Sequence, residues 1–433
     1  MPATGNRITE LLDILPEESR VDADGQLTIG GVAVTELARE YGTPLHVYDE
    51  TGLRRQIRRF VRGLAERWPE STVLFASKSF PAVGMYALAA EEGLSIDVAG
   101  GGELQLALAA GVDPKRIHMH GNAKSDAEIQ MALDAGIGAL IVDNEDEIDR
   151  LERLLTRPQA LLLRVIPGVD ADTHASQATG GNNSKFGLPL TQAAAAIARM
   201  RAHPLMTFEG VHLHIGSQIL DTAPFGEAVA NIASVGEFPV YDVGGGLGVR
   251  YTYAEEAPSV EDYLDRIVAA ARQYLPAGSR IMIEPGRSLV ARAGVTVYDV
   301  LSVKRTGRTF VAVNGGMADQ LDVALTGQRF EAVIADRPLA AWDTVAQVVG
   351  RQCESGDLLI DGAALADPRV GDTLVMATTG AYAYTMSNNY NGALKPAVVF
   401  VADGAARVVV RRETYADLLA THAPAIPDAG PSA

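Results

Sequence analysis

Cysteine is almost absent from this sequence, since Cys353 is the single cysteine among 433 residues. One cysteine excludes an intramolecular disulfide and a cysteine-rich zinc site, and we expect no metal. Long apolar runs are also missing. No stretch approaches the roughly 20 residues of a membrane-spanning helix, and residues 1–19 carry charges where a signal peptide has its apolar segment. These absences favour a cytoplasmic protein without a membrane partner.

Basic residues are scarce as well, because 37 Lys and Arg face 54 Asp and Glu, for a formal net charge of −17. Nucleic acids and anionic membranes attract basic surfaces, so this balance disfavours nucleic acid and membrane as partners. The composition is otherwise that of a globular protein, with 47% hydrophobic and 21% charged residues. A chain of 433 residues predicts two domains, one of which could be a barrel.

Strand and helix patterns alternate between residues 49 and 292. Apolar strand candidates lie at 73–76, 94–98, 116–119, 139–142, 161–166, 208–213, 240–243 and 281–283. Helical patterns lie near 50–66, 80–92, 102–110, 125–135, 145–154, 191–202, 222–233 and 259–275. Eight strands, each with a helix, predict a (β/α)8 TIM-type barrel of the α/β class over 49–292, and a doubly wound open sheet is the alternative.

The pattern after the barrel predicts a second, mainly β domain over 293–422. Apolar strands follow one another there without helices, at 295–301, 310–313, 345–349, 358–360, 373–376, 397–401 and 406–410. The strands of residues 1–48 flank Gly30-Gly31 and have no evident sheet of their own, so we expect them to join the β domain. Residues 423–433 contain three prolines and read as a disordered tail.

Polar side chains stand where the predicted barrel strands end, which is the rim where barrel enzymes carry their sites. Lys78 directly follows the first strand. A lone lysine there is more often a snorkelling side chain, whereas a desolvated ammonium loses its proton readily and becomes a nucleophile toward carbonyls. The other strand ends carry Asp97, His120, Asn122, Asp143, His214, Ser217, Gly244, Gly245, Gly246 and Glu284. Their clustering favours a functional rim, with Asp97, His120, Asn122 and Asp143 interpreted as scaffolding.

The loops after the seventh and eighth strands suit a phosphorylated cofactor. The triplet Gly244–Gly246 leaves backbone N–H groups accessible to a phosphate, and Arg287 beside it suits a phosphate or carboxylate. Glu284 is held by the following proline and favours a cationic group. A lysine amine, a histidine facing a ring, a phosphate loop and an acidic partner are together what pyridoxal 5'-phosphate requires.

A series of motifs resembles the diaminopimelate decarboxylases, which are alanine-racemase-like, fold type III pyridoxal-phosphate enzymes related to ornithine decarboxylases. The resemblance runs from about Leu27 to Leu419. Its motifs are Phe75-Ala-Ser-Lys-Ser-Phe80, Asp97-Val-Ala-Gly-Gly-Gly-Glu-Leu104, Gly121-Asn-Ala-Lys-Ser125, Ser184-Lys-Phe-Gly187, His212-Leu-His-Ile-Gly-Ser-Gln218, Gly244-Gly-Gly-Leu-Gly248, Glu284-Pro-Gly-Arg287, Cys353-Glu-Ser-Gly-Asp357, Gly380-Ala-Tyr382 and Ser387-Asn-Asn-Tyr-Asn391.

The resemblance implies a role for each matching residue. Lys78 would hold the cofactor as an internal aldimine, His214 would stack on its ring, and Glu284 would face the ring nitrogen. Ser217, Gly244, Gly245, Gly246, Gly286 and Arg287 would surround the phosphate or a substrate carboxylate, and Tyr382 would close the site. In the family, Cys353 and Glu354 would enter from the second subunit of a homodimer, as proton donor and as ligand of the distal amine.

One stretch departs from the family. After Gly315-Gly-Met317 the family continues with an arginine, a proline and then a tyrosine, and the arginine and tyrosine contact a substrate carboxylate. Here those positions are Asp322, Val323 and Thr326, and a buried acid repels a carboxylate. The resemblance implies conversion of meso-2,6-diaminopimelate to L-lysine and CO2 if this loop shifts and another group, such as Arg287 alone, holds the distal carboxylate. The alternative is decarboxylation of another amino acid, such as ornithine, lysine or arginine, which carries an amine at that end. A non-catalytic homologue is a further alternative. The segment 225–240 is also short for the family, which implies either a thinner barrel helix or a tighter loop.

Overall fold

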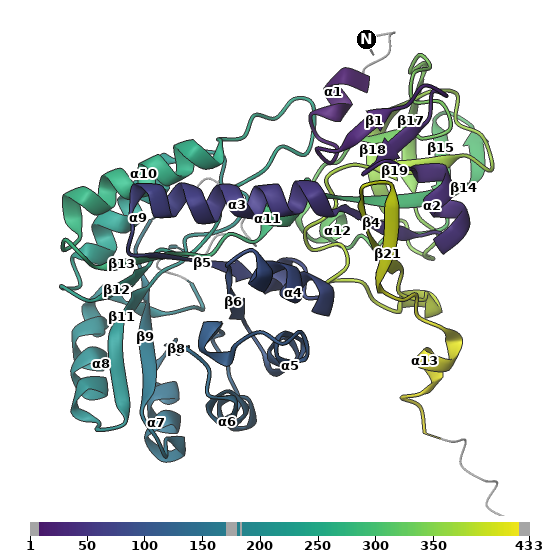
Figure 1. The fold of residues 1–433 in the computed structure, drawn as a ribbon. Helices are drawn as coiled ribbons and strands as arrows, with labels where there is room; N and C mark the ends of the chain where they lie inside the picture. Colours follow the sequence, from purple (N-terminus) through teal and green to yellow (C-terminus); the bar gives the residue numbers. More distant parts are fainter. Residues whose placement is uncertain (1–7, 170–179, 182–183, 424–433) are drawn as a thin grey trace, which may run out of the picture.

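The computed structural model describes residues 8–169, 180–181 and 184–423, and it consists of a barrel and a β domain (Figure 1). The barrel lies on the left of Figure 1, and the β domain lies at the upper right with the C-terminal helix α13 (Tyr415–Leu419) below it. In the described ranges, no helix combines the length and the apolar character needed to cross a membrane. The expected tail at 423–433 lies outside the described residues, except for Ala423.

Eight parallel strands close into a barrel, as the alternating pattern predicted. The ring closes because β13 pairs with β5 and β8 pairs with β9, which rules out the open sheet. In ring order the strands are β5 (Ser71–Ala76), β6 (Ser95–Val98), β7 (Ile117–Met119), β8 (Ala139–Val142), β9 (Gln159–Ile166), β11 (Met206–His212), β12 (Val240–Asp242) and β13 (Arg280–Ile283). The two-residue strand β10 (Leu188–Pro189) adds to β9 outside the ring.

All eight predicted barrel helices are present. They are α3 (Glu50–Arg67), α4 (Val83–Glu91), α5 (Gly101–Ala109), α6 (Asp126–Ala135), α7 (Glu145–Leu154), α8 (Leu190–Ala202), α9 (Ala223–Ala233) and α10 (Val260–Tyr274). Several starts have a polar cap that accepts an orphan backbone N–H, such as Asp49 for α3 and Ser125 for α6. The short 225–240 segment is a tighter loop, because α9 keeps its 11 residues and only 234–239 separate it from β12.

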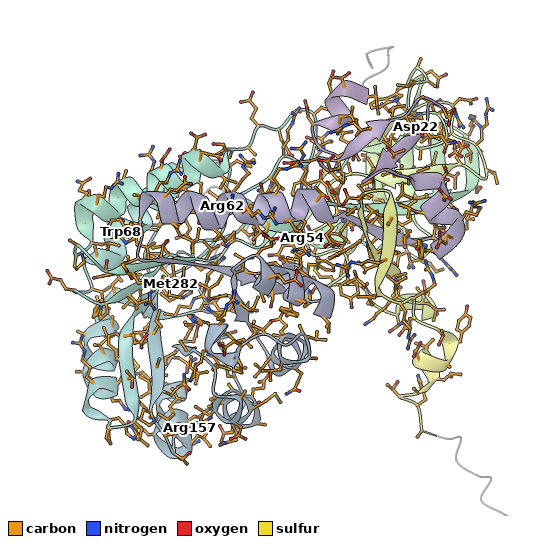
Figure 2. All side chains as sticks on the ribbon, in the orientation of Figure 1. Asp22, Arg54, Arg62, Trp68, Arg157 and Met282 are labelled. Atoms are coloured by element: carbon orange, nitrogen blue, oxygen red, sulfur yellow. The ribbon has the colours of Figure 1, made fainter. Side chains whose placement is uncertain are left out.

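The barrel interior changes from apolar to charged within one pleat. Leu74, Ala139, Ile141, Leu162, Val240 and Met282 form a separate apolar cluster of buried residues. Side chains two positions apart on a strand face the same side, so residues further along these strands lie above that cluster. Leu162 is thus followed by Arg164, Val240 by Asp242 and Met282 by Glu284, and all three polar side chains are buried. Met282, labelled in Figure 2, therefore lies one layer below the charged rim.

The β domain contains the predicted C-terminal strands and one N-terminal strand. Its strands are β14 (Gly294–Arg305), β15 (Thr309–Val313), β16 (Ala332–Ile334), β17 (Thr344–Val349), β18 (Leu358–Leu365), β19 (Thr373–Met376), β20 (Ala397–Ala402) and β21 (Ala405–Val410). β4 (Leu45–Asp49) joins this sheet between β14 and β20, as expected for the N-terminal segment.

The remaining N-terminal strands differ from the expectation, because they pair with one another. β1 (Ser19–Val21), β2 (Leu27–Ile29) and β3 (Val32–Ala33) form their own three-stranded antiparallel sheet. Gly30 and Gly31 have positive φ, which lets the chain reverse tightly between β2 and β3. The sequence also gave no sign of β16 or of the short helix α12 (Asp322–Thr326). The other short elements are α1 (Ile8–Leu12), α2 (Val34–Tyr41), α11 (Arg287–Val290), η1 (Ser77–Ser79), η2 (Pro114–Arg116) and η3 (Tyr390–Gly392).

A buried ion pair joins the loop after β7 to helix α7. The Nζ atom of Lys124 lies 2.7 Å from Oε1 of Glu147, and the two side chains are each 1% exposed. Nζ also donates to the carbonyls of Gly121 and Ile141, at 2.7 and 2.8 Å. Removing one partner leaves the other buried charge unpaired. Lys124→Met should therefore lower the free energy of unfolding, measured by urea denaturation, by about 3–5 kcal/mol.

The double variant Lys124→Met/Glu147→Leu is the control for this prediction. It removes both charges, so it should recover much of the lost stability. A double variant as unstable as the sum of the two single variants would contradict the account.

Candidate active site

A cavity of about 450 Å³ opens at the carboxyl ends of the barrel strands. This volume is within the usual range for sites of small molecules and cofactors. Most of the residues expected from the sequence lie around it, on six different elements or loops. Those that line it are Lys78, His214, Ser217, Glu284, Arg287, Asp322, Thr326 and Tyr382.

Lys78 lies on the turn η1 directly after β5, and its side chain reaches the cavity. Its neighbours Ser77 and Ser79 are buried, whereas Lys78 is exposed. This corrects the expectation of a desolvated lysine, because the turn lifts the side chain off the packed strand. The carbonyl of Ser79 accepts the N–H of Tyr382 at 2.8 Å. The turn that carries the lysine is thereby fixed to the segment that carries the tyrosine.

His214 is a neutral ring at the cavity wall. Its Nδ1 atom accepts the N–H of Gly245 at 3.2 Å. Burial of the ring, together with the nearby Lys78 and Arg164, holds its pKa well below the usual value. With Nδ1 as acceptor, the ring carries its proton on Nε2 and presents an uncharged face to the cavity.

Glu284 is a buried carboxylate held by two histidines. The Nε2 atom of His120 lies 3.0 Å from Oε1, and that of His212 lies 3.2 Å from Oε2. Burial alone would raise the pKa of Glu284, but His120 and His212 hold it well below its usual value. Glu284 therefore stays anionic at the base of the cavity. The ligand atoms of these three side chains lie within 4.8 Å of one another, so the group also has the spacing to hold a metal ion.

The pKa values of the two aspartates beside Glu284, Asp97 and Asp242, are raised instead of lowered. Burial raises the pKa of Asp97 to about 7, with Glu284 adding to the rise and His120 opposing it. Burial and Glu284 also raise the pKa of Asp242 well above its usual value. Burial and the neighbouring carboxylate thus favour the neutral form of these aspartates, whereas His120 and His212 favour the charged form of Glu284.

The glycine triplet permits close packing between three loops. A Cβ on Gly245 would lie 2.0 Å from the carbonyl oxygen of Glu284, and Gly244 and Gly246 both have positive φ. The N–H of Gly244 donates to Asp242 and the N–H of Gly245 donates to His214. The triplet thus orders His214, which lines the cavity, and the buried Asp242, while none of the three glycines is among the described lining residues.

Arg287 is buried and already has several partners. Its Nε donates to Ser217 Oγ at 3.2 Å and its NH1 to the hydroxyl of Tyr251 at 2.6 Å. NH1 also lies 3.6 Å from Oδ2 of Asp322, and the guanidinium stacks 4.7 Å from the ring centre of Tyr382. Asp322 and Thr326 belong to α12, and the Thr326 hydroxyl lies 3.2 Å from Asp322 Oδ1.

Cys353 and Glu354 are exposed on the loop between β17 and β18. Neither is among the described residues that line the cavity of the same chain. The N–H of Cys353 donates to Asn391 Oδ1 at 2.8 Å, and Glu354 accepts the Tyr390 hydroxyl at 2.5 Å. The loop is therefore held in place against the 388–391 segment.

Asp319 lies in the polar network that supports the Cys353 loop. It accepts hydrogen bonds from the Tyr298 hydroxyl and the Gly316 N–H, at 2.6 and 2.9 Å, and burial raises its pKa to about 7. The unfolded chain releases this proton near pH 4, so between pH 4 and 7 the native state binds more protons. Unfolding free energy therefore falls as pH rises through this window, by up to about 4 kcal/mol for this group.

The variant Asp319→Asn should remove this part of the pH dependence. Urea denaturation at pH 5 and pH 8 measures the slope, and Asp146→Asn, at an exposed position on α7, is the matched control. The Asp319 account is wrong if Asp319→Asn and Asp146→Asn keep the same slope.

Of the four rim residues interpreted as scaffolding, two line the cavity instead. Asp97 and His120 face it and form a chain to Glu284, with His120 Nε2 3.6 Å from Asp97 Oδ1. Asn122 and Asp143 do act as scaffolding: the Asn122 carbonyl accepts the Asn144 side chain, and Asp143 Oδ1 accepts the N–H of Gly187.

Several site residues were not identified from the sequence. Arg164, Phe186 and His212 are among them, and so is Tyr251, the partner of Arg287. The spacing of His212 and His214 could have identified one, because residues two apart at a strand end share a face. Tyr251 lies in a loop without a regular pattern, so no local signal pointed to it.

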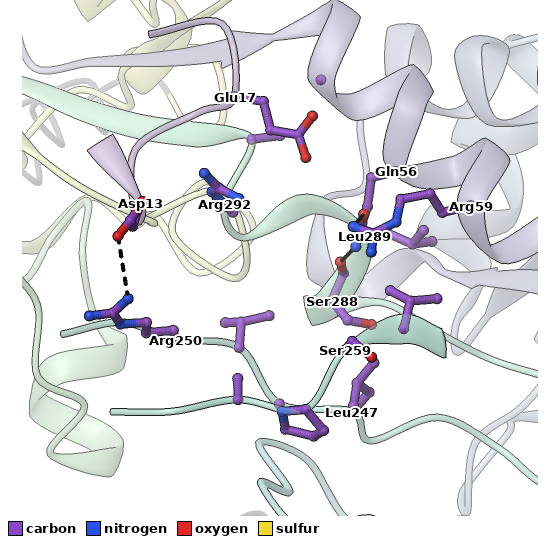
Figure 3. Close-up of a pocket in the computed structure, with 17 residues that line it drawn as sticks. Asp13, Glu17, Gln56, Arg59, Leu247, Arg250, Ser259, Ser288, Leu289 and Arg292 are labelled. Carbon is purple, nitrogen blue, oxygen red and sulfur yellow. Dashed lines mark hydrogen bonds and ion pairs between the residues drawn. The ribbon is translucent and has the colours of Figure 1, made fainter. Parts of the chain in front are cut away.

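A second, smaller cavity of about 200 Å³ lies beside helix α11 (Figure 3). It is lined by Ser288 and Leu289 of α11 and by residues of α3 and the start of α10. Its charges are largely paired within the chain, since Arg250 lies 3.8 Å from Asp13 and Arg59 lies 2.8 Å from Glu261. None of the described residues expected at the active site lines it.

Comparisons with known proteins agree with this geometry. A family model described as "Pyridoxal-dependent decarboxylase, pyridoxal binding domain" matches residues 53–291. The diaminopimelate decarboxylase of Bacillus subtilis (strain 168) is 43% identical over 421 residues, covering 93% of this chain and 96% of that protein.

Two solved structures extend the likeness to the whole fold. A diaminopimelate decarboxylase from M. jannaschi has a TM-score of 0.88 at 30% identity, covering 95% of this chain and 99% of that chain. The diaminopimelate decarboxylase of Helicobacter pylori complexed with L-lysine has a TM-score of 0.80 at 30% identity, covering 89% and 98%.

Proposed function

Since this chain belongs to the pyridoxal-dependent diaminopimelate decarboxylases, we propose that it converts meso-2,6-diaminopimelate to L-lysine and CO2 at the cavity around Lys78. The observation that carries this proposal is the presence of Lys78 and the anionic Glu284 in the lining of one cavity. A carbonyl-reactive amine and a carboxylate that stays ionised are the two groups that a pyridine aldehyde cofactor needs at its opposite ends.

The residues of the cavity fit pyridoxal phosphate. The pKa of Glu284 is held low, so its carboxylate can keep a proton on a ring nitrogen. His214 offers a neutral ring face, and Lys78 is the exposed amine among the described lining residues. Of the residues expected at the phosphate, Ser217 and Arg287 line the cavity, and the loops after β12 and β13 that carry Gly244, Gly245, Gly246 and Gly286 would supply backbone N–H groups to it.

Each residue then has a physical task in the reaction. When bound, pyridoxal phosphate supplies an electron sink for the pair left when CO2 departs from the α-carbon. Lys78 would hold the cofactor until the substrate amine replaces it. Glu284 would keep a proton on the ring nitrogen, and the neutral His214 would lie against the ring. Tyr382, stacked on Arg287, would cover the cavity from the β domain.

We propose that the proton returned to the α-carbon comes from a second subunit. Cys353 and Glu354 are exposed and are not among the described residues that line their own cavity, which suits a head-to-tail homodimer in which this loop reaches the partner's site. A thiol is a weak acid, so it spares the carbanion until CO2 has left. The domain boundaries at 48/49 and 292/293, and a cytoplasmic location, remain proposals from the sequence.

The experiment that tests the function measures both products. Purified protein with pyridoxal phosphate is incubated with meso-2,6-diaminopimelate, and CO2 and L-lysine are quantified against time. CO2 and L-lysine are expected to form at equal initial rates, before L-lysine accumulates. Protein that binds the cofactor and releases no CO2 from any diamino acid would contradict the proposal and favour a non-catalytic homologue.

A further inference from the structure

Helix α12 brings a buried acid to the cavity that contains Lys78. Asp322 is 3% exposed and lines the cavity from helix α12, together with Leu325 and Thr326. Its Oδ1 atom lies 3.2 Å from the Thr326 hydroxyl, while Oδ2 accepts no hydrogen bond from any described residue. A buried carboxylate oxygen without a hydrogen-bond donor is costly, and a donor brought by a ligand would relieve that cost.

The cation beside Asp322 is Arg287, which already contacts Asp322 and two other side chains. Arg287 NH1 lies 3.6 Å from Asp322 Oδ2, and the same guanidinium donates to Ser217 and Tyr251. A carboxylate on the substrate would have to compete with Asp322 for the guanidinium. It would also lie beside a like charge, in a region where such repulsion is weakly screened.

The other charges that line the cavity also disfavour a second carboxylate on the substrate. The described lining residues carry three basic groups, Lys78, Arg164 and Arg287, and three acidic groups, Asp97, Glu284 and Asp322. Lys78 is used by the cofactor, and Arg164 is buried near Asp143, Glu284 and Asp97, whose charges favour its charged form. A cofactor phosphate adds further negative charge, so a second carboxylate on the substrate would have to share Arg287 or Arg164 with the acids near them.

We infer that Asp322, supported by Thr326, is a specificity-determining residue that selects a distal ammonium over a distal carboxylate. The inference rests on the proposed decarboxylation and narrows its substrate class. Diamino monocarboxylic acids such as L-lysine should be used at least as efficiently as meso-2,6-diaminopimelate. In that reaction the bond between the α-carbon and the carboxylate breaks, CO2 leaves, and a proton takes its place, so that L-lysine gives 1,5-diaminopentane.

Three amino acids of equal chain length test this in the wild-type holoenzyme. L-Lysine ends in an ammonium, L-norleucine in a methyl group and L-2-aminoadipate in a carboxylate. Initial rates of CO2 release should give kcat/KM in that order, with L-lysine favoured over L-2-aminoadipate by about 100-fold. A preference for L-2-aminoadipate, or for meso-2,6-diaminopimelate over L-lysine by more than about tenfold, overturns the inference and leaves the proposed function standing.

The variant Asp322→Asn isolates the charge while keeping the shape and an acceptor for Thr326. It should reduce the ratio of L-lysine to L-2-aminoadipate by about tenfold or more, mainly through KM for L-lysine. The control is Asp361→Asn, at an exposed position on β18, which should keep the wild-type ratio. An unchanged ratio in a folded Asp322→Asn protein also overturns the inference.

A binding measurement separates this inference from the proposed function. If no amino acid yields CO2, the proposed function fails. Calorimetry on the wild-type protein with 1,5-diaminopentane and glutarate then decides the inference alone. Tighter binding of the diamine supports selection by Asp322, and equal or tighter binding of the diacid overturns it.

Discussion

Replacing Lys78 by alanine is expected to lower the decarboxylation rate by at least about 1000-fold, because the reaction loses the amine that holds the cofactor and exchanges with the substrate. Lys78 is the exposed lysine on the turn after β5, and among the described cavity residues no second lysine could replace it. CO2 release measures the loss. The near-visible absorbance band of the cofactor bound to Lys78 should disappear as well.

Two controls keep this prediction specific to the amine. Lys115→Ala removes an exposed lysine before β7, at the other end of the barrel, and should retain wild-type activity. Added methylamine should partly restore the Lys78→Ala variant, because a free amine can take over the exchange step. A Lys78→Ala protein that keeps both the band and the activity would show that the cofactor is held elsewhere.

Mixing two inactive variants should restore activity if the site is shared between subunits. Cys353→Ala is expected to lower the rate by about 100-fold to 10,000-fold, the range for loss of a positioned acid. In a homodimer, a Cys353→Ala subunit paired with a Lys78→Ala subunit has one site that lacks both groups and one intact site. Subunit exchange in an equal mixture should therefore recover about a quarter of the wild-type activity.

The mixing experiment can also contradict a site shared between subunits. If Cys353 served the cavity of its own chain, each site in the mixture would lack one group and no activity would return. The position of Cys353 on an exposed loop, held to Asn391 and outside the cavity of its own chain, favours recovery. Cross-linking or light scattering on the same sample shows whether mixed dimers have formed.

Much of the fold was predictable because its parts depend on local periodicity. All eight barrel strands and all eight helices follow from alternating apolar runs and amphipathic stretches. Closure of the sheet was not determined by local pattern, since it depends on the pairing of β13 with β5, which lie far apart in sequence. The separate sheet of β1–β3 was missed for a related reason, because the local sequence of a short strand does not determine which strand it pairs with.

The site was predictable where its residues stand at strand ends. Lys78, His214 and Glu284 were identified because a barrel brings the carboxyl ends of its strands to one rim. The roles of His120 and Asp97 could not be derived, because their contacts with Glu284 depend on three-dimensional distances of 3.0 and 3.6 Å across the ring. The pairing of Asp322 with Arg287 was equally hidden, since α12 belongs to the β domain and meets α11 only in the folded chain.

Borohydride reduction followed by peptide mass spectrometry identifies the lysine that carries the cofactor. The protein is saturated with pyridoxal phosphate, reduced, digested and searched for peptides that carry the added pyridoxyl mass. The account predicts a single major modified residue, Lys78, and its loss when the substrate is bound before reduction. Modification at another lysine in place of Lys78, or an unmodified Lys78 in a protein that releases CO2, would contradict it.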